Sequence, residues 1–383
     1  MESKNSREEV LDKRIVAARK AAGFSITEAA QKLGFKNYQT LSAIEKGARK
    51  INAHELIMIA RLYGRSLDYF LESDVAPDPV PLWRKNTGTD VNQIQRRFLS
   101  FLENYSNLEH LLGLKRRWKD IQKNYDRDDF SGNGFERADK LGAEIHNFLD
   151  LGSCPSSNLL NVLENKLRFK ILHLSLGDGA SGASVVDNTL GVGILINAND
   201  APWRRNFDLA HELFHVISWN VFSPEEIGNG TTKTRPEKYA DIFASTLLLP
   251  EAHLLDALKE TATDNEVRPI DIIELAKDFG VSTEAILWRL VNLKRLKKTQ
   301  AQKVLDNSDF RDLDRNMRRR LFKSDRPSKF PSRFISLACR CLMDGKISRG
   351  TFAQYLEIDR AEIDEYLEDA GFVEGNYGKI ATA

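Results

Sequence analysis

The stretch from Asn206 to Trp219 constrains this chain most, because it places two histidines and a glutamate within an apolar segment. It has the sequence N-F-D-L-A-H-E-L-F-H-V-I-S-W, in which H-E-x-x-H falls on His211, Glu212 and His215. Helix positions four apart lie on one face, so the two imidazoles can bind one metal ion. The alternative is a chance spacing of two histidines on a core helix. A third ligand decides between these interpretations.

A second helix is expected from Glu237 to about Pro250, with Pro236 just inside its start. Glu237 follows His215 closely enough for a loop to bring this helix back against the first. A catalytic zinc takes three protein ligands and a water, so a carboxylate here suits the third position. Asp241, one turn further, is placed to accept the free ring N–H of a ligating histidine. The alternative is that both carboxylates are ordinary solvated residues; their apolar surroundings favour the site.

These motifs carry a family resemblance. H-E-L-F-H preceded by R-R-N-F-D-L-A, and E-x-x-A-D-x-F-A-x-x-L-L-L-P further on, resemble the ImmA/IrrE family of metallopeptidases. The resemblance implies that His211, His215 and Glu237 bind Zn²⁺ and that Glu212 is the general base. It also implies a protein substrate of the repressor class. Phe214 departs from the family, which often has a small residue there, and would narrow the space beside the metal.

Strand-like segments precede the H-E-x-x-H helix, at 168–176, 182–186 and 190–197. Together they predict the small sheet of an α+β, zincin-like metallopeptidase domain. Because an edge strand beside such a site holds a peptide by main-chain pairing, we expect 191–197 to lie near the metal. Tyr239 and Arg205 are the candidates for steadying the oxyanion.

The N-terminal part, from residue 13 to 71, predicts five short helices that end at glycines or at turns. G-F-S-I-T-E-A-A-Q-K-L-G-F, followed by L-S-A-I-E-K-G, resembles the Xre/Cro family of helix-turn-helix domains. Between Lys13 and Lys50 the basic residues outnumber the acidic ones nine to two, which is typical of a phosphate-binding face. A helical bundle that binds protein instead of DNA is the alternative.

Within this domain the second helix of the motif would enter the major groove. Gln39 is the best candidate for a base contact, since its amide can bind adenine bidentately. The other expected contacts with double-stranded operator DNA are Thr27, Lys36, Asn37, Tyr38, Thr40 and Lys50. The expected core residues are Ala30, Leu33, Leu41, Ile44, Ile57 and Leu62.

The whole chain therefore predicts a multidomain, mainly α protein. We expect 10–72 to form the helix-turn-helix domain, 73–90 a linker, 91–165 a helical region, 166–255 the metallopeptidase core, and 256–383 a helical C-terminal region with helix-turn-helix-like segments. Trp83, at the end of the linker, is expected to dock on a flanking domain. The acidic C-terminal helices are expected to contact protein, such as a second copy of the chain.

Composition adds three limits. No apolar run approaches the roughly 20 residues needed to span a bilayer, and the N-terminus lacks an apolar signal core, so we expect a cytoplasmic protein with no membrane partner. The cysteines, Cys154, Cys339 and Cys341, cannot form a disulfide framework and are expected to be reduced. The net charge of +1 indicates nothing about nucleic acid; only the distribution of charge does.

Two functions fit these observations. In the first, the chain is a homodimeric regulator, of the stress-response kind, whose DNA-binding domain brings a zinc endopeptidase to an operator, where it cleaves a repressor. In the second, it is a non-proteolytic transcription factor or toxin–antitoxin component whose metal domain is structural or senses a ligand. The intact Glu212 favours the first, because a structural zinc needs no base.

Overall fold

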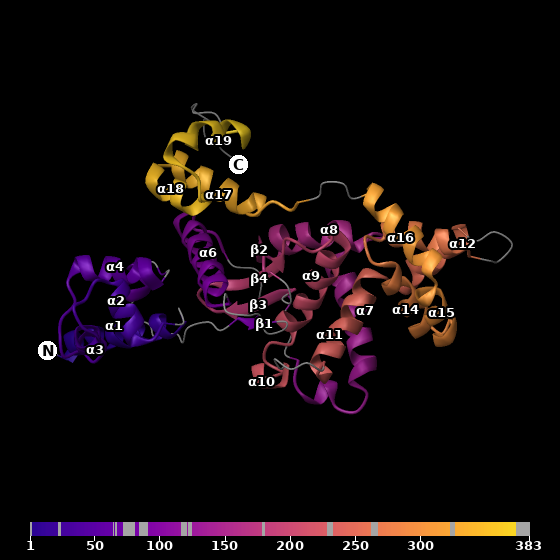
Figure 1. The fold of residues 1–383 in the computed structure, drawn as a ribbon, viewed down its shortest axis with the longest axis horizontal. Helices are drawn as coiled ribbons and strands as arrows, with labels where there is room; N and C mark the ends of the chain where they lie inside the picture. The colour runs from indigo at the N-terminus through magenta and orange to yellow at the C-terminus, as the bar shows by residue number, and fades with distance from the viewer. Residues whose placement is uncertain are drawn as a thin grey trace, which may run out of the picture. The chain divides into compact units, whose positions relative to one another are not determined.

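The computed structural model describes residues 2–21, 24–63, 65, 67–71, 81–83, 91–115, 121, 125–177, 181–227, 233–261, 267–321 and 326–372. The chain divides into two compact units (Figure 1). The first combines Met1–Asp78 with Asp90–Lys115 and Phe330–Ala383. The second combines Pro79–Thr89 with Arg116–Lys329. The mainly α, multidomain architecture is confirmed.

The first unit contains the expected five-helix bundle: α1 (Glu2–Ala21), α2 (Ile26–Lys32), α3 (Tyr38–Glu45), α4 (Ala53–Tyr63) and α5 (Leu67–Leu71). Ser25 and Glu28 form the predicted capping box of α2, and Asn37 caps α3 by accepting from the Thr40 amide. The first helix begins well before the predicted Lys13.

The core of this bundle was predicted correctly on α2 and α3 and one residue out of phase on α4. Of the six expected residues, Ala30, Leu33, Leu41 and Ile44 are buried. Ile57 and Leu62 are only half-buried, because the face of α4 that packs inward carries Leu56, Ile59, Ala60 and Tyr63.

The rest of the first unit is built around α6 (Val91–Leu111). The helices α17 (Ser332–Met343), α18 (Arg349–Leu356) and α19 (Ile363–Asp369), with the short η4 (Arg360–Glu362), complete it. Two buried arginines bind acidic residues of α6: Arg65 pairs with Glu103 at 2.6 Å, and Arg333 pairs with Glu109 at 2.7 Å. The predicted helical region 91–165 is thus divided, since α6 belongs to this unit and its remainder to the other.

The second unit contains a four-stranded sheet in the order β1-β3-β4-β2. The strands are β1 (Leu82–Trp83), β2 (Lys170–Leu174), β3 (Gly182–Asp187) and β4 (Gly191–Asn197). The three predicted strands are confirmed, and β1 was not foreseen as a strand. β4 lies in the interior of the sheet, antiparallel to β3 and parallel to β2. The strand next to β1 is therefore β3, and 191–197 is not an edge strand.

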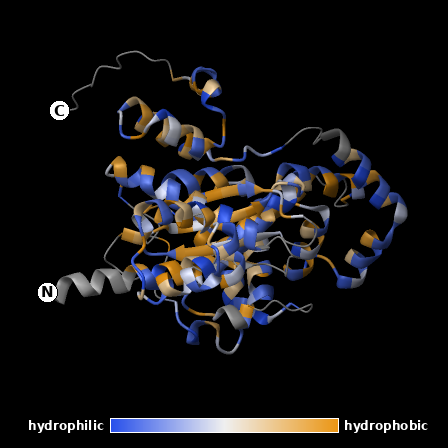
Figure 2. Ribbon diagram, turned by 60° about the vertical axis from the view of Figure 1, so that its left-hand side comes forward, coloured by the Kyte–Doolittle hydropathy of each residue, from blue (hydrophilic) through white to orange (hydrophobic). Residues whose placement is uncertain are grey.

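Helices pack around this sheet to complete the second unit. They are η2 (Asp128–Phe130), α7 (Gly134–Leu149), α8 (Pro155–Asn161), the π-helical turn η3 (Val162–Lys166), α9 (Pro202–Ile217), α10 (Pro224–Ile227), α11 (Arg235–Leu248), α12 (Glu251–Thr261), α13 (Pro269–Asp278), α14 (Thr283–Asn292), α15 (Lys298–Asp306) and α16 (Ser308–Leu321). α9 contacts β3, β4 and α11, and α11 packs along α7. Hydrophobic residues gather on the strands and on the helices beside them (Figure 2).

No helix in the described part of the chain is both long and apolar enough to cross a membrane. The three cysteines are free, as expected, and Cys339 and Cys341 are buried.

The close approach of α7 to α11 depends on Gly142. A Cβ at this position would lie 2.8 Å from the Phe243 carbonyl oxygen and 2.9 Å from the Thr246 Cβ. We therefore expect Gly142→Ala to push α11 outward and lower the free energy of unfolding by about 1–3 kcal/mol. Urea denaturation followed by circular dichroism measures the change. Ala143→Ser, at an exposed position of the same helix, is the control and should change stability by less than about 0.5 kcal/mol.

Candidate metal centre and nucleic-acid interface

The metal ligands predicted from the sequence lie on two neighbouring helices, α9 and α11. Pro202 begins α9 at a position where a missing N–H costs nothing, and Pro236 does the same for α11. Each helix turns its apolar residues into the core. His211, His215 and Glu237 are buried where the helices face each other.

The donor atoms of these residues surround one point. His211 Nε2 lies 3.1 Å from His215 Nε2, His215 Nε2 lies 3.1 Å from Glu237 Oε1, and His211 Nε2 lies 3.4 Å from Glu237 Oε2. Zinc ligands at 2.0–2.1 Å in tetrahedral geometry are separated by about 3.3 Å. The spacing and the chemistry of this donor set therefore fit a zinc ion with one further coordination position.

Asp241 supports the first histidine from behind. Its Oδ1 lies 3.1 Å from His211 Nδ1, so the ring N–H can donate to the carboxylate and leave Nε2 free for the metal. Lys233 forms an ion pair with the other carboxylate oxygen of Asp241. The spacing on α11 predicted Asp241, whereas no sequence pattern indicated Lys233. His215 Nδ1 is buried and has no hydrogen-bond partner among the described residues.

The electrostatics keep both carboxylates ionised. Burial raises the pKa of Asp241, but the hydrogen bond and charge of His211, together with Lys233, outweigh burial and lower the pKa to about 2. Burial also raises the pKa of Glu237, and the two histidines outweigh it, which holds that pKa well below its usual range. A metal ligand must be deprotonated, and Glu237 meets that requirement at neutral pH.

Glu212 is a residue of α9, and its side chain lies beside the start of β3. It is 1% exposed, and a Cβ on Gly182 would lie 3.2 Å from its Oε1. The same Cβ would lie 2.9 Å from the Leu195 carbonyl oxygen, so a larger residue at this position would crowd both β4 and the carboxylate. The sequence placed Gly182 at the start of a strand but gave no sign that it would meet Glu212.

The structure gives Tyr239 a different environment from the predicted one. Its ring stacks at 5.8 Å on Phe130 and meets Phe135 edge-on at 5.0 Å, while its hydroxyl lies against Gly134. On α11 it projects about 160° away from both Glu237 and Asp241. This geometry argues against an oxyanion role, and we assign Tyr239 to the core.

Phe214 also belongs to the aromatic core. Its ring contacts Phe130 at 5.9 Å and Phe243 at 5.6 Å, and it is fully buried. The bulk at this position therefore packs the interior of the domain. Its ring also meets the His215 ring edge-on at 5.8 Å, so it lies beside one of the predicted metal ligands.

The predicted oxyanion candidate Arg205 and its neighbour Arg204 have different partners. Arg205 donates to the Asp200 carbonyl at 2.8 Å, so it is bound at the N-terminal end of α9. Arg204 is partly exposed, contacts Asp208 at 3.1 Å, and donates to the Ser181 hydroxyl at 3.3 Å. Arg204 therefore links α9 to the residue that precedes Gly182, beside Glu212.

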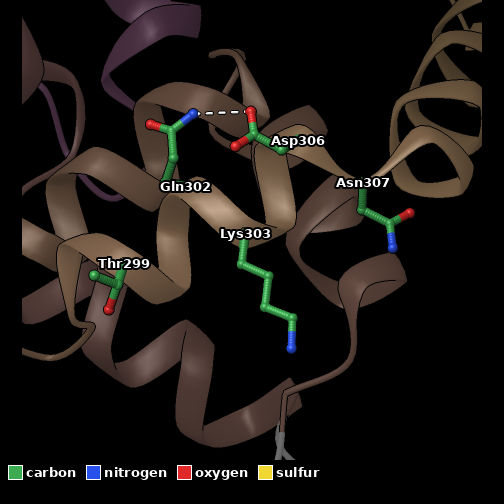
Figure 3. A pocket seen from close by; sticks show the side chains of 5 residues that line it. All are labelled: Thr299, Gln302, Lys303, Asp306 and Asn307. Atoms are coloured by element: carbon green, nitrogen blue, oxygen red, sulfur yellow. Dashed lines mark hydrogen bonds between the residues drawn. The ribbon is translucent and has the colours of Figure 1, made fainter.

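The second unit also has a surface hollow, which is separate from the metal ligands. It has a volume of about 490 Å³ and is lined by Thr299, Gln302, Lys303, Asp306 and Asn307, from α15 and its C-terminal cap (Figure 3). Gln302 donates to Asp306 at 2.9 Å. This hollow contains none of the predicted site residues.

The predicted DNA contacts lie in the first turns of α2 and α3, in the turn between these helices, and after α3 at Lys50. Thr27, Lys36, Asn37, Tyr38, Gln39 and Lys50 are exposed, and Thr40 is half-buried. Tyr38 is 49% exposed, an unusual position for a large aromatic side chain. The side-chain Oδ1 of Asn37 accepts from the backbone amide and the hydroxyl of Thr40, so these two residues order the N-terminus of α3.

Not every basic residue in the count of nine faces solvent. Arg19 binds Glu45 at 2.6 Å, Arg49 binds Glu55 at 2.7 Å, and Arg14 is buried. Arg49 is nevertheless exposed, and the positive face is carried mainly by the exposed lysines Lys13, Lys20, Lys32, Lys36, Lys46 and Lys50.

Two protein-family models match the chain. Residues 164–291 match the IrrE N-terminal-like domain of the M78 peptidases, and residues 15–70 match a helix-turn-helix domain. No curated protein matches the chain.

The metal centre makes a prediction about zinc content. Purified wild-type protein should contain one zinc per chain, and His215→Ala and Glu237→Ala should lose it, because two ligands cannot replace three. Asp241→Asn should bind zinc about 10- to 100-fold more weakly, since it removes the carboxylate that orients His211. Elemental analysis after dialysis against a graded chelator measures all three. Glu212→Gln is the control and should keep its zinc; a wild-type chain that binds none would contradict the site.

Proposed function

We propose that the chain is a DNA-binding regulator with a zinc-dependent endopeptidase, because residues 15–70 match a helix-turn-helix domain and residues 164–291 match the IrrE N-terminal-like domain of the M78 peptidases. The single observation that carries the proposal is the convergence of His211, His215 and Glu237 within 4.8 Å of one another. A structural zinc site usually has four protein ligands, whereas a catalytic site has three and leaves one position open.

The buried Glu212 supports hydrolysis rather than a purely structural site. Zinc held by the three ligands would supply Lewis-acid activation of water and of a peptide carbonyl. Glu212 would take a proton from the attacking water and then return it to the leaving amine. Its burial excludes competing bulk solvent, and its side chain lies beside Gly182 at the start of β3.

Arg204 is the better candidate for the group that steadies the oxyanion. It is linked to Asp208 on α9 and to Ser181 just before β3, with part of its side chain open to solvent. Arg205 is already bound to the Asp200 carbonyl. Neither arginine is required for holding the metal.

The substrate class follows from the partnership of the two domains. A helix-turn-helix domain concentrates the peptidase on DNA, where other DNA-binding proteins are the nearest substrates. We therefore propose a repressor-like protein as substrate, in agreement with the family resemblance. Repressor-like domains bind paired half-sites, so a homodimer is the expected DNA-bound form.

The alternative is a transcription factor or toxin–antitoxin component whose metal domain only senses a ligand or stabilises the fold. A side chain that blocks the metal would favour it. The residue proposed for that role, Phe214, is edge-on to His215 and buries its ring against Phe130 and Phe243. The contacts therefore favour the peptidase.

Replacing the general base tests the activity. Glu212→Gln should keep the fold and the zinc and lower the hydrolysis rate by at least about 100-fold, because the amide cannot accept the proton of water. Cells that express wild-type protein should show new protein N-termini in a DNA-binding protein, detected by N-terminal labelling and mass spectrometry. Cells that express Glu212→Gln are the matched control. Equal sets of new termini in both would refute the peptidase.

The DNA-binding face makes a separate prediction. On DNA selected by the wild-type protein from a randomised pool, Gln39→Ala should weaken binding by about 1–3 kcal/mol and relax the preference at one base pair. Lys36→Ala should instead weaken binding to all sequences and reduce the salt dependence by about one charge. Fluorescence anisotropy at several salt concentrations separates these effects. Arg61→Ala, at an exposed position of α4, is the control; a face with no role in DNA binding would leave all three variants alike.

A further inference from the structure

The first residue of β3, Gly182, lies beside the side chain of Glu212, the proposed general base. A Cβ on Gly182 would meet both the Oε1 atom and the Cγ atom of Glu212, at 3.2 and 3.3 Å. One side of β3 pairs along its whole length with β4, from Gly182 opposite Ile196 to Asp187 opposite Gly191. The other side of β3 is thus the sheet edge closest to the proposed catalytic carboxylate.

Part of this edge is occupied by the chain itself. Leu82 pairs with Ser184 and Trp83 with Ala183, in antiparallel register. From Leu82 to Trp83 the backbone of β1 advances toward Gly182, and so toward Glu212. In the described part of this segment two residues pair with β3, and they cover the edge at Ala183 and Ser184.

The register also fixes which way Leu82 points. Residues directly opposite in an antiparallel pair share a face, and so do residues two apart on one strand. Leu82, Ser184 and Gly182 therefore lie on the same face, the one on which Glu212 lies. In agreement, Leu82 is 7% exposed and belongs to the hydrophobic core that includes Leu209 and Leu213 of α9.

Ser184 adds an observation of a different kind. It is fully buried on this face, and its hydroxyl has no hydrogen-bond partner among the described residues. A buried hydroxyl without a partner is uncommon. Beside Leu82, it offers a hydrogen-bonding group to a chain that pairs with β3.

We propose that the β3 edge is the docking strand for an extended peptide substrate, and that β1 occupies this strand in the resting chain. The docked peptide adds to β3 antiparallel, by main-chain hydrogen bonds, with an apolar side chain in the place of Leu82. β1 must leave before the substrate binds. This inference rests on the proposed peptidase only in that the docked peptide is taken to be its substrate. Docking itself can be measured without cleavage.

A reversible cross-link tests the docking strand. Leu82→Cys and Ser184→Cys are introduced together into full-length protein that carries Glu212→Gln, which prevents hydrolysis, and Cys154→Ser, which removes the partly exposed native thiol. The probe is a fluorescein-labelled synthetic peptide with the chain's own sequence from 79 to 90, P-V-P-L-W-R-K-N-T-G-T-D. Fluorescence anisotropy measures its binding with the disulfide formed and after reduction.

We expect the oxidised protein to bind the peptide at least about tenfold more weakly than the same protein after reduction. A peptide with aspartate in the place of its leucine should bind the reduced protein at least about tenfold more weakly than the parent peptide, because the charge would enter an apolar site. Leu82→Asp in the chain, which releases β1, should strengthen binding of the parent peptide by a similar factor.

Two outcomes would overturn the proposal: equal binding by the oxidised and reduced proteins, or no disulfide in protein whose circular dichroism shows a native fold. A failure of the proposed peptidase would give a different result from these two outcomes. The oxidised and reduced proteins would still bind the peptide differently, but wild-type protein loaded with zinc would cleave no peptide.

Discussion

The packing of α9 against α11 is the contact on which the proposed chemistry depends. It brings two imidazoles and a carboxylate into one buried space, with donor atoms 3.1–3.4 Å apart. Such a cluster is costly in an apolar interior unless something pairs its charges. Asp241 and Lys233 extend the network on one side, and a divalent cation would balance the anionic Glu237 from within. Gly142, which lets α7 approach α11, supports this arrangement from outside the site.

The parts of the site that follow a helical period could be predicted from the sequence. His211 and His215 lie four apart on one helix, and Glu237 and Asp241 lie four apart on the next, so local geometry alone places each pair on one face. Gly182 and Lys233 are near the site only because distant segments meet there. Tyr239 shows the opposite error, because closeness in sequence to Glu237 suggested a role that its direction on the helix does not allow.

The same distinction applies to the fold. Capping residues and strand alternation predicted α2, α3 and the three longer strands, since each signal is local. Nothing local indicated that α6 belongs with the C-terminal helices, because the contacts between Glu109 and Arg333 join residues far apart in the chain. The predicted DNA contacts lie mostly at exposed positions. Arg19 and Arg49 are paired with Glu45 and Glu55, and a count of basic and acidic residues cannot show which of them pair.

The pairing of β1 with β3 connects the edge of the sheet with the proposed catalytic site. An exposed strand edge is a liability, since its unpaired amides and carbonyls invite pairing with other chains, and proteins commonly cover such edges. An enzyme that recognises extended peptides needs that edge available. A long covering strand would protect β3 and block it permanently, whereas no cover would leave it open to nonspecific pairing. In the described residues, β1 covers the edge with two paired residues and one buried leucine, and the proposed substrate would displace it by pairing with more of β3.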